Sequence, residues 1–317
     1  MIPKHGRNKI PIMDQWSFCR QASLSIIYLL YLNTSMKKEK TINLNGTYYS
    51  AGKLIGTSNR AFLYGDSVFE SIRFDGNILL WNLHYARLLR AAAALGYTFY
   101  PWWTEDFFRY EILKTVKENR VESARIRLIL FRDEEGISYQ PKSDSCSYLI
   151  DVIPMDEPAY SLQEKGVVLG LYEDDYKHNS PFSGFKSGQS MLYVMASRKG
   201  RTQAWDEVLI QNTEGRICES NTGNVWVVKD GNIMTPPLEE GGICGVMRDH
   251  LMHLLPQHDM EVVEVPLEKK ILADADEIWI SNAVRGLRWV DKFDGKTFGS
   301  EKAIQIQHLL QTEIQHD

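Results

Sequence analysis

The segment Gly184-Phe185-Lys186-Ser187-Gly188-Gln189-Ser190 leads directly into the apolar run Met191-Leu192-Tyr193-Val194-Met195-Ala196. One lysine therefore lies where a glycine-containing loop passes into a segment with the periodicity of a helix. An amine that is fixed at such a junction and partly removed from water has a lowered pKa, which frees its lone pair to attack a carbonyl carbon. Lys186 is thus a candidate Schiff-base lysine, although most lysines are solvated surface residues and the segment alone does not separate the two cases.

The size and net charge of the chain limit the kinds of protein that it can be. With 317 residues the chain exceeds the usual size of a single core, so two domains are expected. Hydrophobic residues make up 44% and charged residues 24%, as in ordinary globular proteins, and the net charge of −5 argues against a general nucleic-acid binder. The expected partner is a small molecule or another protein chain.

The cysteines and histidines give no sign of a metal site. The four cysteines are spaced without a Cys-x-x-Cys pattern, and the eight histidines show no His-Glu-x-x-His spacing. We therefore predict neither a disulfide framework nor a metal, and a cytoplasmic location.

Residues 1–35 differ from the rest of the chain. Basic residues precede the apolar run 24–32, as in a signal peptide, but the run is too short to span a membrane and no clear cleavage site follows it. Met36 opens a segment that looks like a natural start. An over-called start codon or a disordered extension is therefore favoured over secretion, and no membrane association is expected.

The sequence predicts a small α+β domain over residues 36–155. Asn45-Gly46 and Asp75-Gly76 supply the positive φ angles of hairpin turns between strand-like segments, the second hairpin continuing through Trp81. Helices are expected from Asn82 to Gly96 and from Thr104 to Asn119. Alternating residues then predict paired strands at 125–132 and 146–153, so that helices gather on an antiparallel sheet.

A polar connection containing proline, residues 156–165, looks like a linker to a larger α/β domain at 166–317. Strands are predicted there at 167–172, 207–211, 224–228, 261–265 and 277–280. They interleave with helices after Ser187, after Gly245 and from about Ser300. The larger domain carries Lys186.

Three further stretches suit a phosphorylated, nitrogen-containing cofactor. Glu219 lies among short hydrogen-bonding residues at 218–224, between two apolar strands, where a carboxylate can hold a protonated ring nitrogen. The glycine-rich segment 241–249 enters a helix, whose free N–H groups suit an anion. Arg87 follows His84 by one helical turn and can hold phosphate oxygens. Taken singly, the Glu219 stretch fits a polar surface turn, the glycine-rich segment a flexible loop, and the His84/Arg87 stretch a surface pair.

Taken together and in order, these stretches resemble the class IV pyridoxal 5′-phosphate (PLP) enzymes, which comprise branched-chain aminotransferases, D-amino acid aminotransferases and aminodeoxychorismate lyases. The similarity covers roughly Ile42 to Val290. The segments on which this similarity rests are Asn59–Arg73, His84-x-x-Arg87, Phe185-Lys186-Ser187, Glu219–Asn224, Pro236-Pro237-Leu238 and Gly245–Arg248. The resemblance implies a D-amino acid aminotransferase-like fold, with two α/β domains, a homodimer and the cofactor between the domains.

The resemblance also implies roles for individual residues. Lys186 is the Schiff-base lysine and proton carrier, and Glu219 pairs with the pyridine nitrogen. The phosphate is held by Arg87, Asn221, Thr222 and the amides of Val246 and Met247. Candidates for contact with substrate are Phe69, Arg73, Arg132, Arg285 and Arg288, the arginines because a guanidinium group suits a carboxylate.

The sequence departs from the family patterns at two positions. Branched-chain enzymes carry a tyrosine where Met191 stands, and D-amino acid enzymes carry one where Phe69 stands, so neither usual phenol for the cofactor O3′ is present. Tyr193 or Tyr64 could substitute. The segment 281–290 resembles the lyases, whereas Val68–Arg73 is closer to the aminotransferases.

The leading hypothesis is an aminotransferase acting between a branched-chain or D-amino acid and a 2-oxo acid. One alternative is a 4-amino-4-deoxychorismate lyase that yields 4-aminobenzoate and pyruvate. The other is a protein that binds PLP without turnover, which the two missing tyrosines suggest.

Overall fold

A computed structural model describes residues 40–50, 56–133 and 138–314. The predicted extension at residues 1–35 lies outside the described residues. From Thr41 onward the chain forms one compact unit. Within the described part, no helix is both long and apolar enough to cross a membrane.

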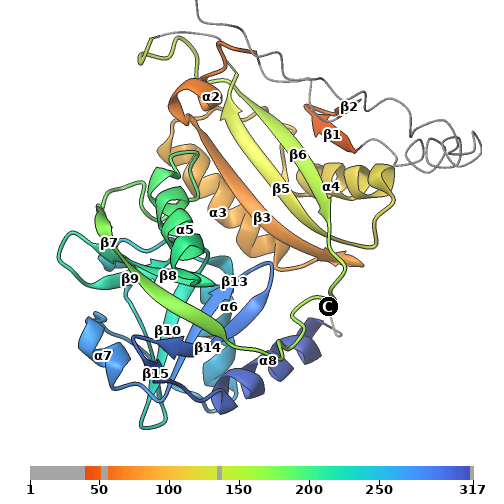
Figure 1. Cartoon of the computed structure of the whole chain (residues 1–317). Coiled ribbons are helices and arrows are strands. Elements are labelled where there is room, and N and C mark those ends of the chain that lie inside the picture. The colour runs from red at the N-terminus through yellow and green to blue at the C-terminus, as the bar shows by residue number, and fades with distance from the viewer. Residues whose placement is uncertain (1–39, 51–55, 134–137, 315–317) are drawn as a thin grey trace, which may run out of the picture. The chain divides into compact units, whose positions relative to one another are not determined.

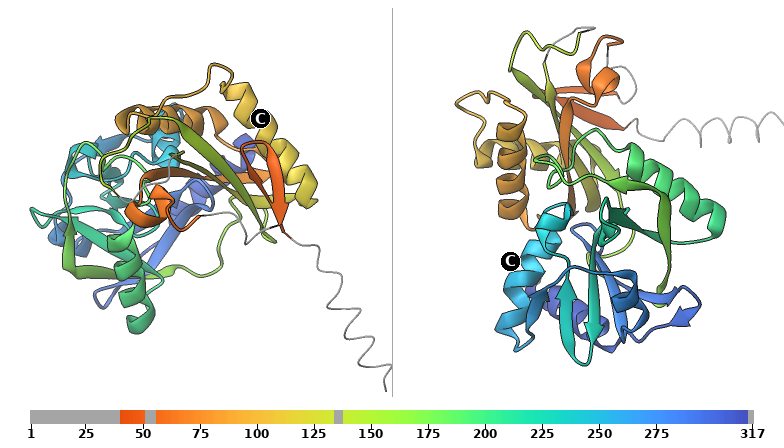
Figure 2. Two further views of the ribbon diagram at one scale, coloured as in Figure 1. Left: turned by 90° about the horizontal axis from the view of Figure 1, so that it is seen from above. Right: turned by 90° about the vertical axis from the view of Figure 1, so that its left-hand side faces the viewer.

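The first sheet contains the strands before residue 155, in the order β2-β1-β6-β5-β3-β4, and every neighbouring pair is antiparallel. Its strands and the helices between them are β1 (Thr41–Leu44), β2 (Thr47–Ser50), α2 (Arg60–Tyr64), β3 (Ser67–Asp75), β4 (Asn77–Ile78), α3 (Trp81–Ala94), α4 (Glu105–Asn119), β5 (Ser123–Arg132) and β6 (Cys146–Pro154). Helices α3 and α4 lie on one face of this sheet (Figures 1 and 2). The predicted antiparallel sheet with helices on it is confirmed.

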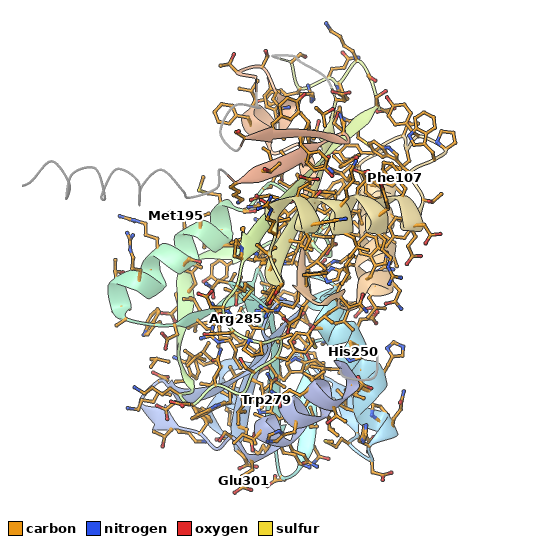
Figure 3. All side chains as sticks on the ribbon, turned by 90° about the vertical axis from the view of Figure 1, so that its right-hand side faces the viewer. Phe107, Met195, His250, Trp279, Arg285 and Glu301 are labelled. Carbon is orange, nitrogen blue, oxygen red and sulfur yellow. The ribbon has the colours of Figure 1, made fainter. Side chains whose placement is uncertain are left out.

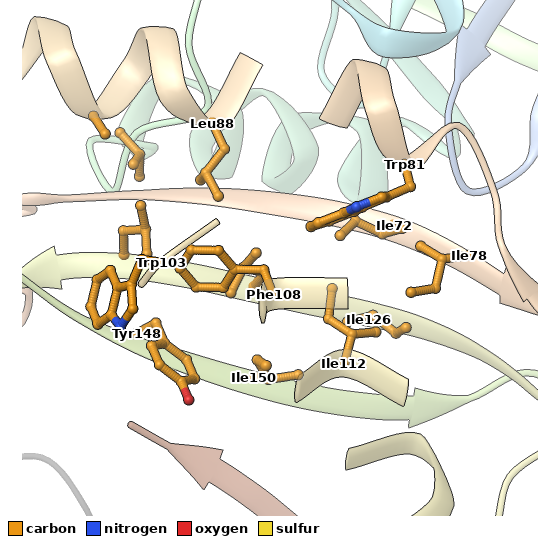
Figure 4. Packing of buried hydrophobic residues seen from close by; sticks show 14 of the residues in the cluster. Ile72, Ile78, Trp81, Leu88, Trp103, Phe108, Ile112, Ile126, Tyr148 and Ile150 are labelled. Atoms are coloured by element: carbon orange, nitrogen blue, oxygen red, sulfur yellow. The ribbon is translucent and has the colours of Figure 1, made fainter. Parts of the chain in front are cut away.

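The core of the first sheet follows from the alternation along its strands. In β5 every second residue is buried, from Ala124 through Arg132. These residues meet the apolar faces of α3 and α4, where Leu88, Phe108 and Ile112 are almost fully buried (Figure 4). The intervening residues of β5 face the opposite side, and this second face forms part of the candidate site.

The second sheet is mixed and follows the order β12-β11-β10-β13-β14-β7-β8-β9, with β15 paired to β14. Its elements are β7 (Val167–Lys177), α5 (Met191–Gln203), β8 (Glu207–Asn212), β9 (Ile217–Ser220), β10 (Asn224–Lys229), β11 (Asn232–Thr235), the 3₁₀ turn η1 (Leu238–Glu240), α6 (Val246–Gln257), β12 (Val262–Glu264), α7 (Lys269–Ala273), β13 (Glu277–Asn282), β14 (Gly286–Phe293), β15 (Lys296–Thr297) and α8 (Glu301–Ile314). All five predicted strands are present, and β9, β11, β14 and β15 were not predicted.

Helices cover both faces of the second sheet, as in α/β proteins generally. Trp226 and Val228 of β10 pack with α6 and α8, whereas Val225 and Val227 point to the other face, toward α7. Both sets are buried because each face of the strand is covered. The change from one sheet to the other falls between Pro154 and Val167, at the predicted linker, while the division into two domains stays a prediction.

Two local predictions near the start of α3 are wrong. The second hairpin was expected to continue through Trp81, but β4 ends at Ile78 and Trp81 is the first residue of the helix. The N-cap is Leu80, with a left-handed φ of 53°, and Asn82 lies within the first turn. Burial of Trp81 against the first sheet accounts for the early start of the helix, since apolar packing outweighs a side-chain cap.

Candidate functional site

A cavity of about 900 Å³ opens between the two sheets. Its surface combines the free face of β3 and β5, the loop at 178–190, β9 and the turn after it, and the N-terminus of α6. Small-molecule sites commonly measure about 300–1,000 Å³, so the cavity can hold a cofactor together with a small substrate.

The backbone of the Lys186 loop is fixed from both sides of the cavity. The Phe69 N–H of β3 donates to the Lys186 carbonyl at 2.8 Å, and the Gly188 N–H donates to the Ser67 carbonyl at 2.8 Å. On the other side, the Cys244 N–H donates to the Gly184 carbonyl at 3.0 Å. A Cβ atom at Gly188 would lie only 2.5 Å from Ser67 Oγ, so the close approach of this loop to β3 requires a glycine.

The Lys186 side chain lines the cavity, with its Nζ 5.8 Å from the centre of the Phe69 ring. Burial and the nearby Arg87 charge lower the pKa of Lys186 from 10.5 to about 8, against the opposing effects of Glu219 and Glu70. A substantial fraction of this amine is therefore neutral near physiological pH, as a nucleophile and proton carrier requires.

Glu219 is buried in β9, not in the turn where it was expected, because the strand runs through Ser220 before the chain reverses at 221–223. Its Oε1 accepts hydrogen bonds from Lys177 Nζ at 2.5 Å and from the Tyr193 hydroxyl at 2.7 Å. Its Oε2 accepts the Ile243 N–H at 2.9 Å. Three donors thus fix a carboxylate that lines the same cavity as Lys186.

Arg87 belongs to a buried group of charges on α3 and β3. Its Nε donates to Glu70 Oε1 at 2.8 Å, its Nη2 donates to Glu70 Oε2, and His84 Nδ1 lies 2.6 Å from Glu70 Oε2. Burial acts to raise the pKa of Glu70, but the charge of Arg87 and the hydrogen bonds from Arg87 and His84 outweigh it, and the pKa falls to about 2. Glu70 therefore stays ionised and holds Arg87 at the cavity.

The N-terminus of α6 lies beside Arg87, because Arg87 Nη1 donates to the Cys244 carbonyl at 2.9 Å, immediately before the helix. The N-cap Gly245 provides no side-chain acceptor for the first N–H groups of this 12-residue helix. Such groups have no intrahelical partner, and the helix dipole favours negative charge there. With the guanidinium of Arg87, the amides of Val246 and Met247 form a donor set for a phosphate group.

The side chains of Asn221 and Thr222, which were predicted to bind phosphate, make hydrogen bonds within the protein. Asn221 Oδ1 accepts the Val208 N–H at 2.8 Å, and its Nδ2 donates to Ser197 Oγ at 2.9 Å. The Thr222 hydroxyl donates to the Glu207 carboxylate at 2.8 Å. Both residues line the cavity, but their polar side-chain atoms serve to hold the turn after β9.

The structure brings three of the five substrate candidates to the cavity, namely Phe69, Arg285 and Arg288. Arg285 is exposed in the turn between β13 and β14 and lies between the two sheets in Figure 3. The Nη1 of Arg288 donates to Glu207 Oε1 at 2.5 Å and its Nε donates to Gln163 Oε1 at 3.1 Å.

Arg73 and Arg132, the other two substrate candidates, do not line the cavity. Both are buried within the first half of the chain. Arg73 contacts Met155, Ser123 and the Glu157 carbonyl, whereas Arg132 is held by the carboxylates of Asp66 and Asp144. Their guanidinium groups are therefore bound to other parts of the protein.

The sequence reasoning missed four charged residues at or behind the cavity, namely Glu70, Lys177, Arg125 and Arg127. The signal for Glu70 was the strand pattern: Val68 and Ile72, two positions to either side, are apolar and share its face, which therefore turns to the core. Nothing in the local pattern marked Lys177, which pairs with a residue 42 positions away.

The sequence lacks both tyrosines that usually contact the cofactor O3′, and three positions bear on this contact: Tyr193, Tyr64 and Met191. Tyr193 lines the cavity and donates its hydroxyl to Glu219, and burial raises its pKa. Tyr64 packs on the Tyr139 ring at 5.3 Å and does not line the cavity. Met191, which replaces the tyrosine of the branched-chain enzymes, is 72% exposed on α5.

The residues that line this cavity lie within a segment of the chain that matches a protein-family model. Residues 67–293 match the model of the class IV amino-transferases. The chain belongs to the class IV aminotransferase family. The matched range contains the Lys186 loop, Glu219, Arg87 and the N-terminus of α6.

The relatives of this chain carry two kinds of name. The branched-chain amino acid aminotransferase of Escherichia coli is 25% identical over 264 residues, covering 80% of this chain and 84% of the relative. An aminodeoxychorismate lyase of Vibrio harveyi is 27% identical over 232 residues, covering 72% and 83%. Both names occur among the activities that the sequence predicted.

A solved structure supports the predicted fold. An aminotransferase from Brucella abortus, crystallised with PLP, superposes with a TM-score of 0.77 at 20% identity, covering 88% of this chain and all of that one. The predicted class IV fold is thereby confirmed, and the predicted cofactor agrees with the one named for that structure.

Proposed function

We propose that the protein is a PLP-dependent aminotransferase that moves an amino group between an amino acid, of branched-chain or D type, and a 2-oxo acid. The observation that carries this proposal is the position of the Lys186 amine, with its pKa of about 8, in one cavity with Glu219 and the Arg87 guanidinium. The test is stopped-flow absorbance of the PLP-loaded protein with a panel of L- and D-amino acids. No spectral change with any of them would contradict the proposal.

The residues around the cavity fit the cofactor. Arg87 and the N–H groups at the start of α6, which have no intrahelical partner, would hold the phosphate, Glu219 would face the ring nitrogen, and Lys186 would hold the aldehyde carbon covalently. When bound, PLP supplies an electron sink for the pair of electrons left at the substrate Cα.

The chain's own groups then supply binding and proton transfer. Lys186 Nζ, with a pKa near the operating pH, can both accept and donate a proton, which is worth about 10²–10⁴ in rate. Glu219 is held by the Tyr193 hydroxyl and the Ile243 N–H, so it needs little reorganisation to keep a ring nitrogen protonated. Lys177 donates to the same carboxylate.

The low pKa of Lys186 leads to a testable pH dependence. Only the neutral amine captures PLP, so the capture rate in the cofactor-free protein should rise about tenfold per pH unit below pH 8 and level off above it. The measurement is borohydride trapping at short times, followed by peptide mapping. An ordinary solvated lysine would show the rise continuing toward pH 10.5, and that result would exclude the lowered pKa.

We also propose a cytoplasmic homodimer. On α5, Met191, Val194 and Met195 are 72%, 57% and 37% exposed, at the i, i+3, i+4 spacing of a single helical face, and Figure 3 labels Met195. An apolar face of this kind suits a protein partner. Light scattering during size-exclusion chromatography should give twice the monomer mass, and a Val194→Glu variant should shift the mass toward the monomer.

A lyase is the second candidate, because the Asn282-Ala283 segment that resembles the lyases lines the cavity, and the Vibrio harveyi relative carries that name. Incubation with aminodeoxychorismate would then yield 4-aminobenzoate and pyruvate, without a reaction on the amino-acid panel. A covalent PLP adduct on Lys186 with no turnover in either assay would instead support a binding protein.

A further inference from the structure

The linker at residues 155–166, between β6 and β7, does not line the cavity, but hydrogen bonds fix its first half to the first sheet. Arg73 of β3 donates to the Glu157 carbonyl. Asp75 Oδ2, at the end of the same strand, accepts the Ala159 N–H at 2.6 Å. The position of residues 157–159 is therefore set by β3.

Tyr160, the next residue of the linker, is buried and reaches the second sheet. Its hydroxyl donates to the Ala283 carbonyl, in the turn between β13 and β14, at 3.1 Å. Its ring lies against the end of the same turn, because a Cβ atom at Gly286 would be only 3.0 Å from Tyr160 Cδ1. One side chain of the linker thus contacts the turn at two places.

Gln307 of α8 ties the same two segments together. Its side chain is buried, with Nε2 donating to the Tyr160 carbonyl at 2.6 Å and Oε1 accepting the Leu287 N–H at 3.0 Å. Leu287 follows the turn directly, as the second residue of β14. The side-chain amide of Gln307 therefore joins the linker to the strand that leaves the turn.

The turn itself forms part of the cavity wall. Residues 281–285 all line the cavity, and Arg285 is one of the candidates for contact with substrate. Asn282 Oδ1 accepts the N–H groups of Val284 and Arg285 at 3.1 and 3.0 Å, so the turn keeps its own shape. The pairing of β13 with β14 fixes its ends, and the bond from Tyr160 holds its middle.

The backbone of Tyr160 is in an unfavourable conformation. Its φ is 51°, in the left-handed region that residues with a Cβ atom seldom adopt. Such a conformation persists where surrounding contacts fix it, and these conformations are concentrated at functional sites. The contacts that fix Tyr160 lead to the turn and to Gln307, which favours a role in placing the turn over that of a simple connection.

We infer that Tyr160 is a positioning residue, which holds the turn at 282–285 in the cavity wall without touching substrate itself. The hydrogen bonds that hold Lys186, Glu219 and Arg87 involve neither the linker nor this turn. Loss of the Tyr160 hydroxyl should therefore weaken substrate binding and leave the cofactor residues in place. The part of this inference that concerns substrate rests on the proposed function.

Hydrogen exchange tests the position of the turn without substrate or turnover. The substitution Tyr160→Phe keeps the ring and removes only the hydroxyl, so the fold should persist. The Val284 and Arg285 amides should then exchange about 3- to 10-fold faster, as expected for the loss of one hydrogen bond. The amides of β5, on the first sheet, should exchange at an unchanged rate.

Steady-state kinetics tests the effect on substrate, with the amino acid that reacts fastest in the panel. In Tyr160→Phe the KM should rise about 3- to 10-fold, whereas kcat and the rate of PLP capture by Lys186 should stay within about twofold. Gln307→Leu removes both bonds of the side-chain amide and should raise KM at least as much. A role in the fold alone would not separate KM from kcat in this way.

Tyr110→Phe is the matched control, because it removes a hydroxyl from an exposed tyrosine of α4 and should change none of these quantities. Unchanged exchange of the Val284 and Arg285 amides in Tyr160→Phe would overturn the inference, and so would faster exchange without a rise in KM. Equal losses of PLP capture and kcat would overturn it as well, since Tyr160 would then serve the whole fold.

The inference and the proposed function fail in different ways. If no amino acid changes the absorbance of the PLP-loaded protein, the proposed function is wrong, while hydrogen exchange still decides whether Tyr160 holds the turn. If amino acids react but the exchange of the turn is the same in Tyr160→Phe, the proposed function stands and the role of Tyr160 is wrong.

Discussion

Replacement of Lys186 by alanine is expected to lower the rate of amino-group transfer by at least about 10³-fold. The variant loses both the covalent attachment of the cofactor and the amine that moves the proton. PLP can still bind through Arg87 and the N-terminus of α6, so binding should weaken but persist. Stopped-flow absorbance gives the rate, and borohydride trapping with peptide mapping should find no adduct at position 186.

The control is Lys199→Ala, which removes a lysine of α5 that is paired with the exposed Asp174 and does not line the cavity. It should retain full activity. A small primary amine added to Lys186→Ala should restore part of the rate by entering the space that the side chain leaves. Full activity of Lys186→Ala would contradict the role given to this lysine.

The substitution Glu219→Gln is expected to lower the transfer rate by about 10²-fold or more while keeping the shape of the side chain. An uncharged amide cannot keep a ring nitrogen protonated, so the cofactor would withdraw electrons less strongly. Lys177 would also lose the carboxylate that it contacts at 2.5 Å, and removal of one partner of a buried pair costs about 3–5 kcal/mol of stability. Measuring the transfer rate and the thermal unfolding of the same preparation separates the loss of catalysis from the loss of stability.

A double variant makes the separation sharper. In Glu219→Gln with Lys177→Met the orphaned ammonium is absent, so most of the lost stability should return without any return of activity. Glu173→Gln, at an exposed position of β7, serves as the control for a charge change alone. Recovery of activity together with stability would mean that Glu219 acts only on the fold.

Local chemistry explains which elements were predictable. Asn45 and Gly46 have positive φ angles of 50° and 84°, as a tight hairpin requires. Thr104 caps α4, and its hydroxyl accepts the Phe107 N–H at 3.2 Å. In both cases the determining contacts lie within a few residues. The start of α3 was misjudged because burial of Trp81, a tertiary effect, decided it.

For the candidate site, Lys186, Glu219 and Arg87 were singled out through the ordered set of family-like stretches, and all three line one cavity. The site was not predictable where the outcome depends on distant partners. Arg132 was expected at the substrate, yet Asp66, 66 positions earlier, binds it. Arg127 was overlooked because its alternating strand is compatible with any exposed polar face, and only the second sheet turns that face into a cavity.

The backbone bonds of the Lys186 loop have a consequence for how the site is assembled. The Phe69 and Gly188 amides are bonded between the loop and β3, and the Cys244 amide is bonded between the loop and the segment before α6. These three protons exchange with water when the loop separates from β3 or from the segment before α6. Their exchange rates therefore report the opening of the site, without substrate or cofactor.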